Sequence, residues 1–185
     1  MLTREDIIQV ERTVNLLHQR IHAAFLCRDQ SKEGHQVWHE ATSAWHAQKY
    51  ATDFLWSDEF MDDLRKSKPE AIEQAILYLE VDPWYFRSGY LKERLVRKLK
   101  AANLSTKNCN RLLKVIWNVA RGKNRREFRD YCRLAAVVAS EDFRQMLAGV
   151  SAENDTEAKG KFTYLRMHLD RHTTKTEQAV APNDR

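Results

Sequence analysis

Glycine and proline are scarce in this chain, with 5 Gly and 3 Pro among 185 residues. Strands arranged in series need turn residues at short intervals, and glycine and proline most often provide them. The composition therefore argues against a sheet built from many strands. Helices joined by short loops need far fewer such residues, so we expect an all-α fold.

Cysteine is also sparse. Cys27, Cys109 and Cys132 are odd in number, lie far apart and form no C-x-x-C pair. A disulfide framework or a cysteine-based zinc site needs more cysteines at closer spacing. We expect three reduced thiols in or near the core, as in a cytoplasmic protein.

Long hydrophobic runs are missing as well. No stretch approaches the roughly 18 apolar residues that a membrane span needs. The first residues, Met1 to Ile8, contain no basic segment followed by a long apolar run, so a secretory signal is not indicated. We expect a soluble cytoplasmic protein without a membrane partner.

The chain lacks the common catalytic signatures. It contains no glycine-rich phosphate loop and no G-x-S-x-G, S-x-x-K or kinase motif. The adjacent carboxylates Asp58-Glu59 and Asp62-Asp63 would point apart on a helix, which is typical of surface charge. The sequence favours a non-enzymatic protein, and no cofactor is expected.

What is present is the composition of an ordinary globular protein, 43% hydrophobic and 31% charged. We expect one all-helical domain over residues 1–172, made of a long helical hairpin (1–56) and stacked shorter helices (57–172). Residues 173–185 have little to bury and are expected to be disordered.

Apolar residues at alternating spacings of three and four predict a long first helix, and they are Ile7, Val10, Val14, Leu17, Ile21 and Ala24. Thr3 and Asp6 fit a capping box at its start. After a polar turn near residues 29–34, a second helix is expected over about 35–56. The short connection predicts an antiparallel hairpin, and such a hairpin is compatible with a homodimer.

Helix signals recur from residue 57 onward. Candidate starts are serine caps, prolines and one asparagine, namely Ser57, Pro69, Pro83, Ser105, Asn124 and Ser140. Gly122 is a candidate left-handed C-cap, and a last helix is expected at Phe162–His172.

The spacing of these helices resembles that of repeat proteins. Helix starts near residues 57, 88 and 124 are 31 and 36 residues apart, which is within the range of helical solenoids. No residue pattern recurs between the segments. The arrangement resembles HEAT-like helical repeats in architecture, with an irregular helical bundle as the alternative.

Charge is distributed unevenly along the chain, whose formal net charge is +5. Residues 1–83 carry 9 basic and 15 acidic residues, whereas residues 84–135 carry 15 basic and only 3 acidic residues. Nine of those fifteen are arginines, whose planar guanidinium suits bidentate contacts to phosphate or carboxylate. The middle of the chain is therefore the candidate surface for an acidic partner.

The basic residues fall on the polar faces of two predicted helices and on the linker between them. Lys107, Arg111, Lys114 and Arg121 share one face of the helix after Ser105. The candidate binding residues are Arg87, Lys107, Arg111, Lys114, Arg121, Arg125, Arg126, Arg129 and Arg133.

Three interpretations of this basic face stay open. It binds an acidic protein or the acidic N-terminal half of this chain, it binds nucleic acid, or it is a solvated face without a partner. The aromatic residues at 84–90 would either stack on bases of a single strand or belong to the core. No helix-turn-helix, zinc-finger or RNA-binding signature decides between these interpretations.

Histidines of the hairpin suggest a second function class, a metal-binding helical protein with enzymatic activity as an option. Two pairs lie at i, i+4 spacing and a fifth histidine follows on the second helix; the five are His18, His22, His35, His39 and His46. Histidines on facing helices are able to converge on a metal ion. The H-E-x-x-H and paired Glu-x-x-His patterns are absent, however.

Overall fold

The computed structural model describes residues 1–150 and 156–180, with side chains to residue 171. Over these residues the chain forms α-helices and one short 3-10 helix (η1), without a strand, as the composition predicts. The elements are α1 (Arg4–Phe25), α2 (Lys32–Ala47), η1 (Asp53–Trp56), α3 (Asp58–Arg65), α4 (Pro69–Val81), α5 (Ser88–Leu99), α6 (Thr106–Arg121), α7 (Phe128–Val138), α8 (Glu141–Ala148) and α9 (Thr156–Val180).

Local capping signals set several helix starts. At α1 the Thr3 hydroxyl accepts from the Asp6 N–H, and the Asp6 carboxylate accepts from the Thr3 N–H, which completes the predicted capping box. Ser57, Ser105 and Ser140 each accept a hydrogen bond from a backbone N–H in the first turn of α3, α6 and α8. These starts depend on a few neighbouring residues and were therefore readable in the sequence.

Several predicted helix boundaries were wrong. The second helix ends at Ala47, not near residue 56, and the chain continues through a turn in which the Asp53 carboxylate accepts from the Tyr50 N–H. Asp82-Pro83 ends α4 instead of starting a helix, with Asp82 in the left-handed region at φ 53°. Its carboxylate binds cations elsewhere in the fold and so does not cap a following helix.

The end of α6 and the start of α7 also differ from expectation. Gly122 follows α6 with φ −80°, so it is not a left-handed cap. The next helix begins at Phe128 and not near Asn124, because Arg125 turns inward to the body of the protein. The last helix is longer than predicted and extends to Val180, which covers part of the segment expected to be disordered; residues 151–155 and 181–185 lie outside the described residues.

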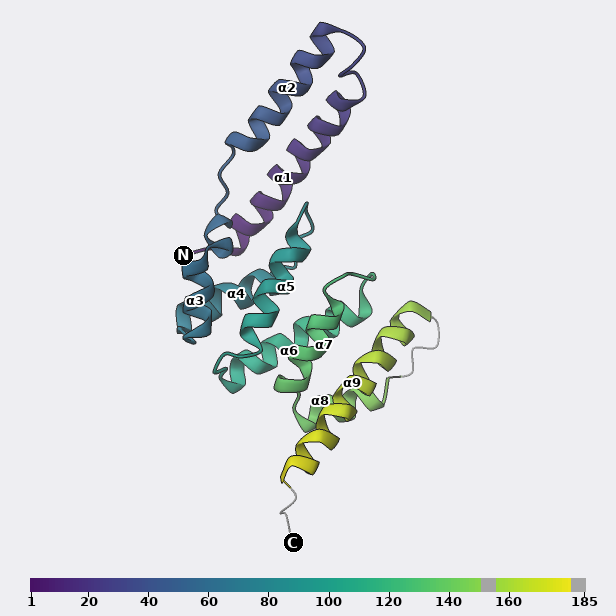
Figure 1. Ribbon diagram of the computed structural model, residues 1–185. Helices are drawn as coiled ribbons and strands as arrows, with labels where there is room; N and C mark the ends of the chain where they lie inside the picture. Colours follow the sequence, from purple (N-terminus) through teal and green to yellow (C-terminus); the bar gives the residue numbers. More distant parts are fainter. Residues whose placement is uncertain (151–155, 181–185) are drawn as a thin grey trace.

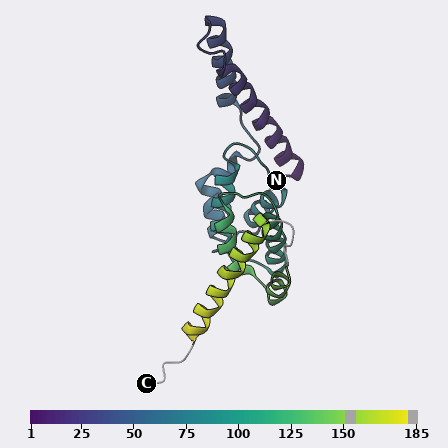
Figure 2. The ribbon, with the colours of Figure 1, turned by 90° about the vertical axis from the view of Figure 1, so that its right-hand side faces the viewer.

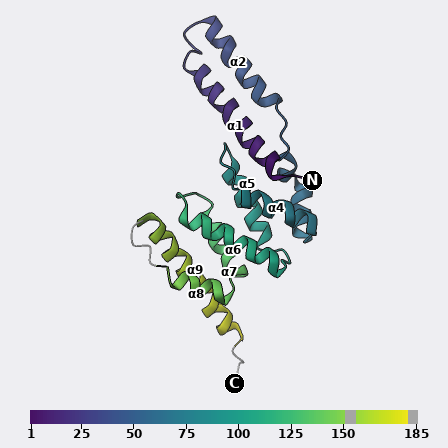
Figure 3. The same ribbon diagram turned by 180° about the vertical axis from the view of Figure 1, so that it is seen from behind.

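The helices are arranged in two regions (Figure 1). The N-terminal pair, α1 and α2, lie side by side and run in opposite directions, as the view from behind also shows (Figure 3). The remaining helices form a stack in which alternate helices touch: α3 with α5, α5 with α7 and α7 with α9 on one layer, and α4 with α6 on the other. The N-terminal pair extends away from one end of the stack, and α9 lies at the other end (Figure 2).

The main hydrophobic core lies within the stack. It is built around residues without solvent exposure on α4, α5, α6 and α7, among them Leu79, Leu95, Ile116 and Ala135. From the N-terminal region only Leu2 and Ile7 join this core among the described residues. Further along α1, Glu11 and Asn15 attach the helix to the stack through hydrogen bonds with the Trp84 backbone. None of the described helices is long and apolar enough to cross a membrane.

Candidate interaction surface at the loop edge

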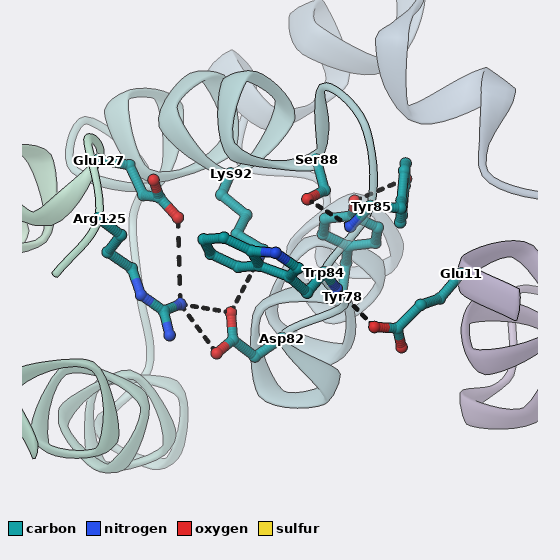
Figure 4. Close-up of polar contacts among 9 residues, drawn as sticks. All are labelled: Glu11, Tyr78, Asp82, Trp84, Tyr85, Ser88, Lys92, Arg125 and Glu127. Carbon is teal, nitrogen blue, oxygen red and sulfur yellow. Dashed lines mark hydrogen bonds and ion pairs between the residues drawn. The ribbon is translucent and has the colours of Figure 1, made fainter. Parts of the chain in front are cut away.

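Two loops that are distant in the sequence meet at one edge of the stack. We call this edge the loop edge and define it by residues 82–90 and 121–127. Arg125 on the second loop places Nη1 2.7 Å from Oδ1 and 2.8 Å from Oδ2 of Asp82 on the first (Figure 4). This ion pair fixes the position of one loop relative to the other.

A buried lysine completes the pairing. Lys92 Nζ lies 2.6 Å from Oδ1 of Asp82, and the Lys92 side chain has no solvent exposure. Burial lowers the pKa of Lys92, and the Asp82 carboxylate opposes that shift. The carboxylate of Glu127, also buried, lies 4.0 Å from Arg125 Nη1 (Figure 4). Two cations and two carboxylates therefore balance one another beneath the edge.

The first loop is held from two further sides. The Trp84 backbone N–H donates to Oε1 of Glu11 at 2.8 Å, and Asn15 of α1 donates to the Trp84 carbonyl. Within the stack, the hydroxyls of Tyr78 and Tyr85 lie 2.7 Å apart (Figure 4). Burial raises the pKa of both tyrosines, so both stay neutral and remain hydrogen-bonding groups at neutral pH.

The backbone of this loop is strained at both ends. Only three described residues other than glycine have positive φ, and two of them are Asp82 (φ 53°) and Arg87 (φ 70°). Such a conformation costs of the order of 1 kcal/mol and persists only where surrounding contacts impose it. The contacts of Asp82, Trp84 and Tyr85 supply that constraint, and strained loops of this kind often carry function.

The constrained loop presents large aromatic side chains to solvent. Trp84, Phe86 and Tyr90 are 60%, 52% and 51% exposed. Of the two alternatives for the aromatic residues at 84–90, a place in the core therefore does not hold for these three. Together with His18 and Arg126 they line a pocket of about 390 Å³. The Arg126 guanidinium lies 3.7 Å from the centre of the Tyr90 ring, a cation–π contact that holds a cation beside the exposed rings.

A second pocket lies on the other side of Phe86, between the N-terminal pair and the stack. It has a volume of about 400 Å³ and is mainly apolar, with Val14, Trp45 and Trp56 among its lining residues. Phe86 also stacks on His18 at 5.1 Å between ring centres and meets Trp45 edge-on. Phe86 therefore forms a wall shared by both pockets.

Arg111, a central residue of the predicted basic face, is satisfied within the chain. Its guanidinium contacts Glu73 at 2.5 Å and both oxygens of Glu80 at 2.7 and 2.8 Å. These hydrogen bonds raise the pKa of Arg111 and lower the pKa of Glu80. Because both carboxylates belong to α4, Arg111 ties the two helices of one layer together.

The other layer has its own ion pairs. On α7, Asp130 accepts from Arg133 at 3.0 Å and from Arg97 of α5, also at 3.0 Å. Arg111 of α6 therefore has its partners on α4, whereas Arg133 of α7 has its partner, Asp130, on α7 itself. Since α6 and α7 belong to different layers, the predicted basic residues are divided between two sides of the stack.

Some predicted binding residues keep their charge exposed. Lys107, Lys114, Arg121 and Arg129 are exposed, and none of the ion pairs of the described residues includes them. Arg87 is exposed and lies over the Trp56 ring at 5.6 Å. Arg126 pairs with Glu93 at 3.1 Å but remains half exposed. Arg87, Arg121 and Arg126 are at the loop edge, together with exposed Lys123, which the predicted set had omitted.

The ion cluster beneath the loop edge was not predicted, although one signal for it exists. Lys92 lies on the same helix stripe as Leu91, Leu95 and Leu99, where an apolar residue is expected. A lysine at such a position indicates a buried cation and hence a carboxylate partner. The sequence does not reveal that Asp82 is this partner.

The predicted metal ligands do not come together. His18 and His22 are neighbours with ring centres 4.4 Å apart, His35 packs against Trp38, and His39 and His46 are exposed on α2. Among the described residues, no group of three or more His, Cys, Asp or Glu side chains is placed to hold a metal ion. The histidines therefore define no site that carries a functional argument.

The cysteines differ in their environments. Cys132 is buried in the core and Cys109 is partly buried against it, as expected. Cys27 is exposed in the turn after α1, contrary to the expectation that it lies in or near the core. Comparison of the chain with family models, curated proteins and solved structures finds no match. The functional argument therefore depends on the loop edge itself.

Proposed function

We propose that this protein is a non-enzymatic interaction module that binds an acidic partner through the loop edge. The observation that carries the proposal is the combination of exposed aromatic rings (Trp84, Phe86 and Tyr90) with exposed or half-exposed cations (Arg87 and Arg126) around one pocket. The ion cluster beneath holds these groups in place before any partner arrives. Such preorganisation lowers the entropic cost of binding.

Among acidic partners, a single-stranded nucleic acid fits this surface best. Exposed rings offer flat faces on which bases stack, at about 1–3 kcal/mol per base. Arg and Lys beside the rings attract phosphates through counterion release, which makes the affinity depend steeply on salt. An acidic protein would use the same cations but has less need of exposed indole and phenyl rings.

The stacking of alternate helices in two layers supports a HEAT-like interpretation of the architecture. In helical solenoids the loops between successive pairs lie along one edge, and such edges and the adjoining curved faces are common binding surfaces. The loops 82–87 and 122–127 would be two such successive connections. The proposal concerns this edge and excludes the outer face of α6, where Lys107 and Lys114 lie.

Fluorescence anisotropy of labelled single-stranded DNA and RNA, titrated at several salt concentrations, tests the proposal. The triple variant R121E/K123E/R126E reverses three charges at the loop edge and should lose at least about tenfold in affinity and reduce the salt slope. The matched control K100E/K107E/K114E makes the same change in net charge at exposed positions outside the edge. It should retain most of the binding.

Trp84→Ala separates stacking from charge. It should weaken the binding of single strands by about 1–3 kcal/mol and change the salt slope little. Equal losses in the two triple variants would attribute binding to net charge and overturn the assignment to the loop edge. If no oligonucleotide binds at low salt, the proposal of a nucleic-acid partner fails. Immobilised polyglutamate then tests for an acidic protein partner. It should retain the wild type and not R121E/K123E/R126E if the partner is an acidic protein.

A further inference from the structure

The N-terminal pair leaves one of its two helices without a buried side chain. Among its 16 residues α2 buries none, whereas α1 buries Ile7, Val10, Val14, Leu17 and Ala24. A short helix in water is marginal without tertiary packing of an apolar face. The pair therefore has an apolar face that this chain itself does not cover.

That face contains a groove between the two helices. The groove has a volume of about 650 Å³, and its apolar lining includes Leu17, Ala24, Val37, Ala41 and Ala44. Val37 is 55% exposed at this surface. Small side chains along a helix pair allow another helix pair to approach closely, and the exposed Val37 supplies apolar area for it to cover.

Two opposite charges flank the groove near the middle of its length. Arg20 lines it on α1 and Glu40 lines it on α2. No ion pair joins the two side chains to each other or to another described residue, and Glu40 accepts only from its helix neighbour Gln36. A surface with an apolar floor and one charge of each sign on its two sides is complementary to itself.

We propose that a second copy of this chain docks on this groove, so that two N-terminal pairs form a four-helix bundle. A two-fold axis parallel to the helices places each α1 against the partner's α2, and Arg20 then faces the partner's Glu40 at two equivalent positions. A two-fold axis across the helices would instead bring Arg20 close to the partner's Arg20. The charges therefore select the first arrangement.

The size of the face is adequate for such an association. At 1.5 Å per residue α2 spans about 24 Å, and two adjacent helices are about 20 Å wide. The projected area is about 480 Å², and the accessible area of a ridged helix surface is larger than its projection. This is of the order of the roughly 800 Å² per partner buried in a standard interface.

Sedimentation velocity over a concentration series tests the proposal with the full chain. The wild type should show a concentration-dependent dimer, and Val37→Asp should raise the dimer Kd at least about tenfold, because a carboxylate would enter the apolar interface. The matched control Val137→Asp alters a valine of α7 with 58% exposure and should leave the dimer unchanged. A wild type that is monomeric at every concentration overturns the proposal.

Charge exchange tests the arrangement. R20E and E40R each place like charges opposite one another and should each weaken the dimer about tenfold. An equimolar mixture of the two variants should recover dimers, since the heterodimer restores both opposite-charge contacts. A contact between Arg20 and Glu40 of one chain would not give this recovery, so a mixture as weak as the single variants contradicts the arrangement. This outcome is independent of nucleic-acid binding at the loop edge.

Discussion

Helices α2 and α4 have similar lengths, 16 and 13 residues, but opposite environments. The side chains of α2 are all at least partly exposed, whereas α4 buries seven of its side chains. Both sequences carry apolar residues at helical spacing. The difference arises because α4 packs against helices on several sides, whereas α2 packs along α1 and otherwise meets Phe86 through Trp45. A helical stripe therefore predicts which face prefers to be buried, and the surrounding helices decide whether that face is covered.

Ion pairs differ in the same way between the two regions. In the N-terminal pair, Arg28 meets Asp29 at the exposed turn, where such pairs contribute little. In the stack, Asp82 pairs with Lys92 and Arg125 at buried positions. Charges in the stack hold loops in place, whereas Arg20 and Glu40 of the N-terminal pair stay available to another molecule.

The largest expected effect comes from a cavity in the stack. Leu95→Ala at a fully buried position of α5 should lower the free energy of unfolding by about 2–5 kcal/mol, because the removed atoms leave an unfilled space. Val37→Ala on α2 should change it by less than about 0.5 kcal/mol when the protein is monomeric. Urea unfolding measures both, and equal losses would show that α2 is as tightly packed as α5.

Removal of the central carboxylate should have the next largest effect. Asp82→Asn keeps the size of the side chain and tolerates the left-handed backbone, but it leaves Lys92 and Arg125 buried with Glu127 as their one nearby carboxylate. We expect a loss of about 2–4 kcal/mol, because uncompensated buried charge is costly. Arg28→Gln at the exposed turn should leave the free energy of unfolding nearly unchanged. Similar values for both variants would contradict the structural role of the cluster.

A smaller and pH-dependent effect is expected at Arg111. Its hydrogen bonds lower the pKa of Glu80 below the ordinary value of 4.5, so their stabilisation is present above pH 4.5 and is lost as the pH falls through the folded-state value. Arg111→Met should cost about 1–2 kcal/mol at pH 7 and make the loss below pH 4.5 shallower. Denaturant unfolding at several pH values measures this, with Lys107→Met as the control; an unchanged pH slope in Arg111→Met would refute the pairing.

The smallest effect on stability is expected from modification of the cysteines. The reactivity of Cys27, at the turn of the N-terminal pair, and of Cys132, in the stack, compares the two regions directly. A thiol reagent should modify exposed Cys27 first in the folded protein and should leave stability nearly unchanged. Burial raises the pKa of Cys132 to about 12, so this thiol should react only after unfolding. Mass spectrometry of protein labelled at low concentration identifies the modified residue. Early labelling of Cys132 would mean that the stack opens readily.

Local sequence signals predicted the helical class and several helix starts, because these depend on short-range chemistry. Thr3, Ser105 and Ser140 cap helices through hydrogen bonds to residues three positions away. The same reasoning failed at Asp82 and Gly122, where the backbone follows contacts with residues on other helices. The exposure of Trp84 and Phe86 was likewise undecided, since an aromatic residue near a loop is compatible with both core and surface.

The excess of basic residues between 84 and 135, their arginine content and their helical spacing were determined by the sequence alone. The tertiary structure decided which of these cations remain free. Arg111 is neutralised by Glu73 and Glu80, and Arg125 by Asp82, all more than 30 residues away in the chain. The physical reason is that helix periodicity specifies the direction of a side chain around its own axis, whereas an ion pair needs a partner within about 4 Å, and only the packing of distant helices brings one there.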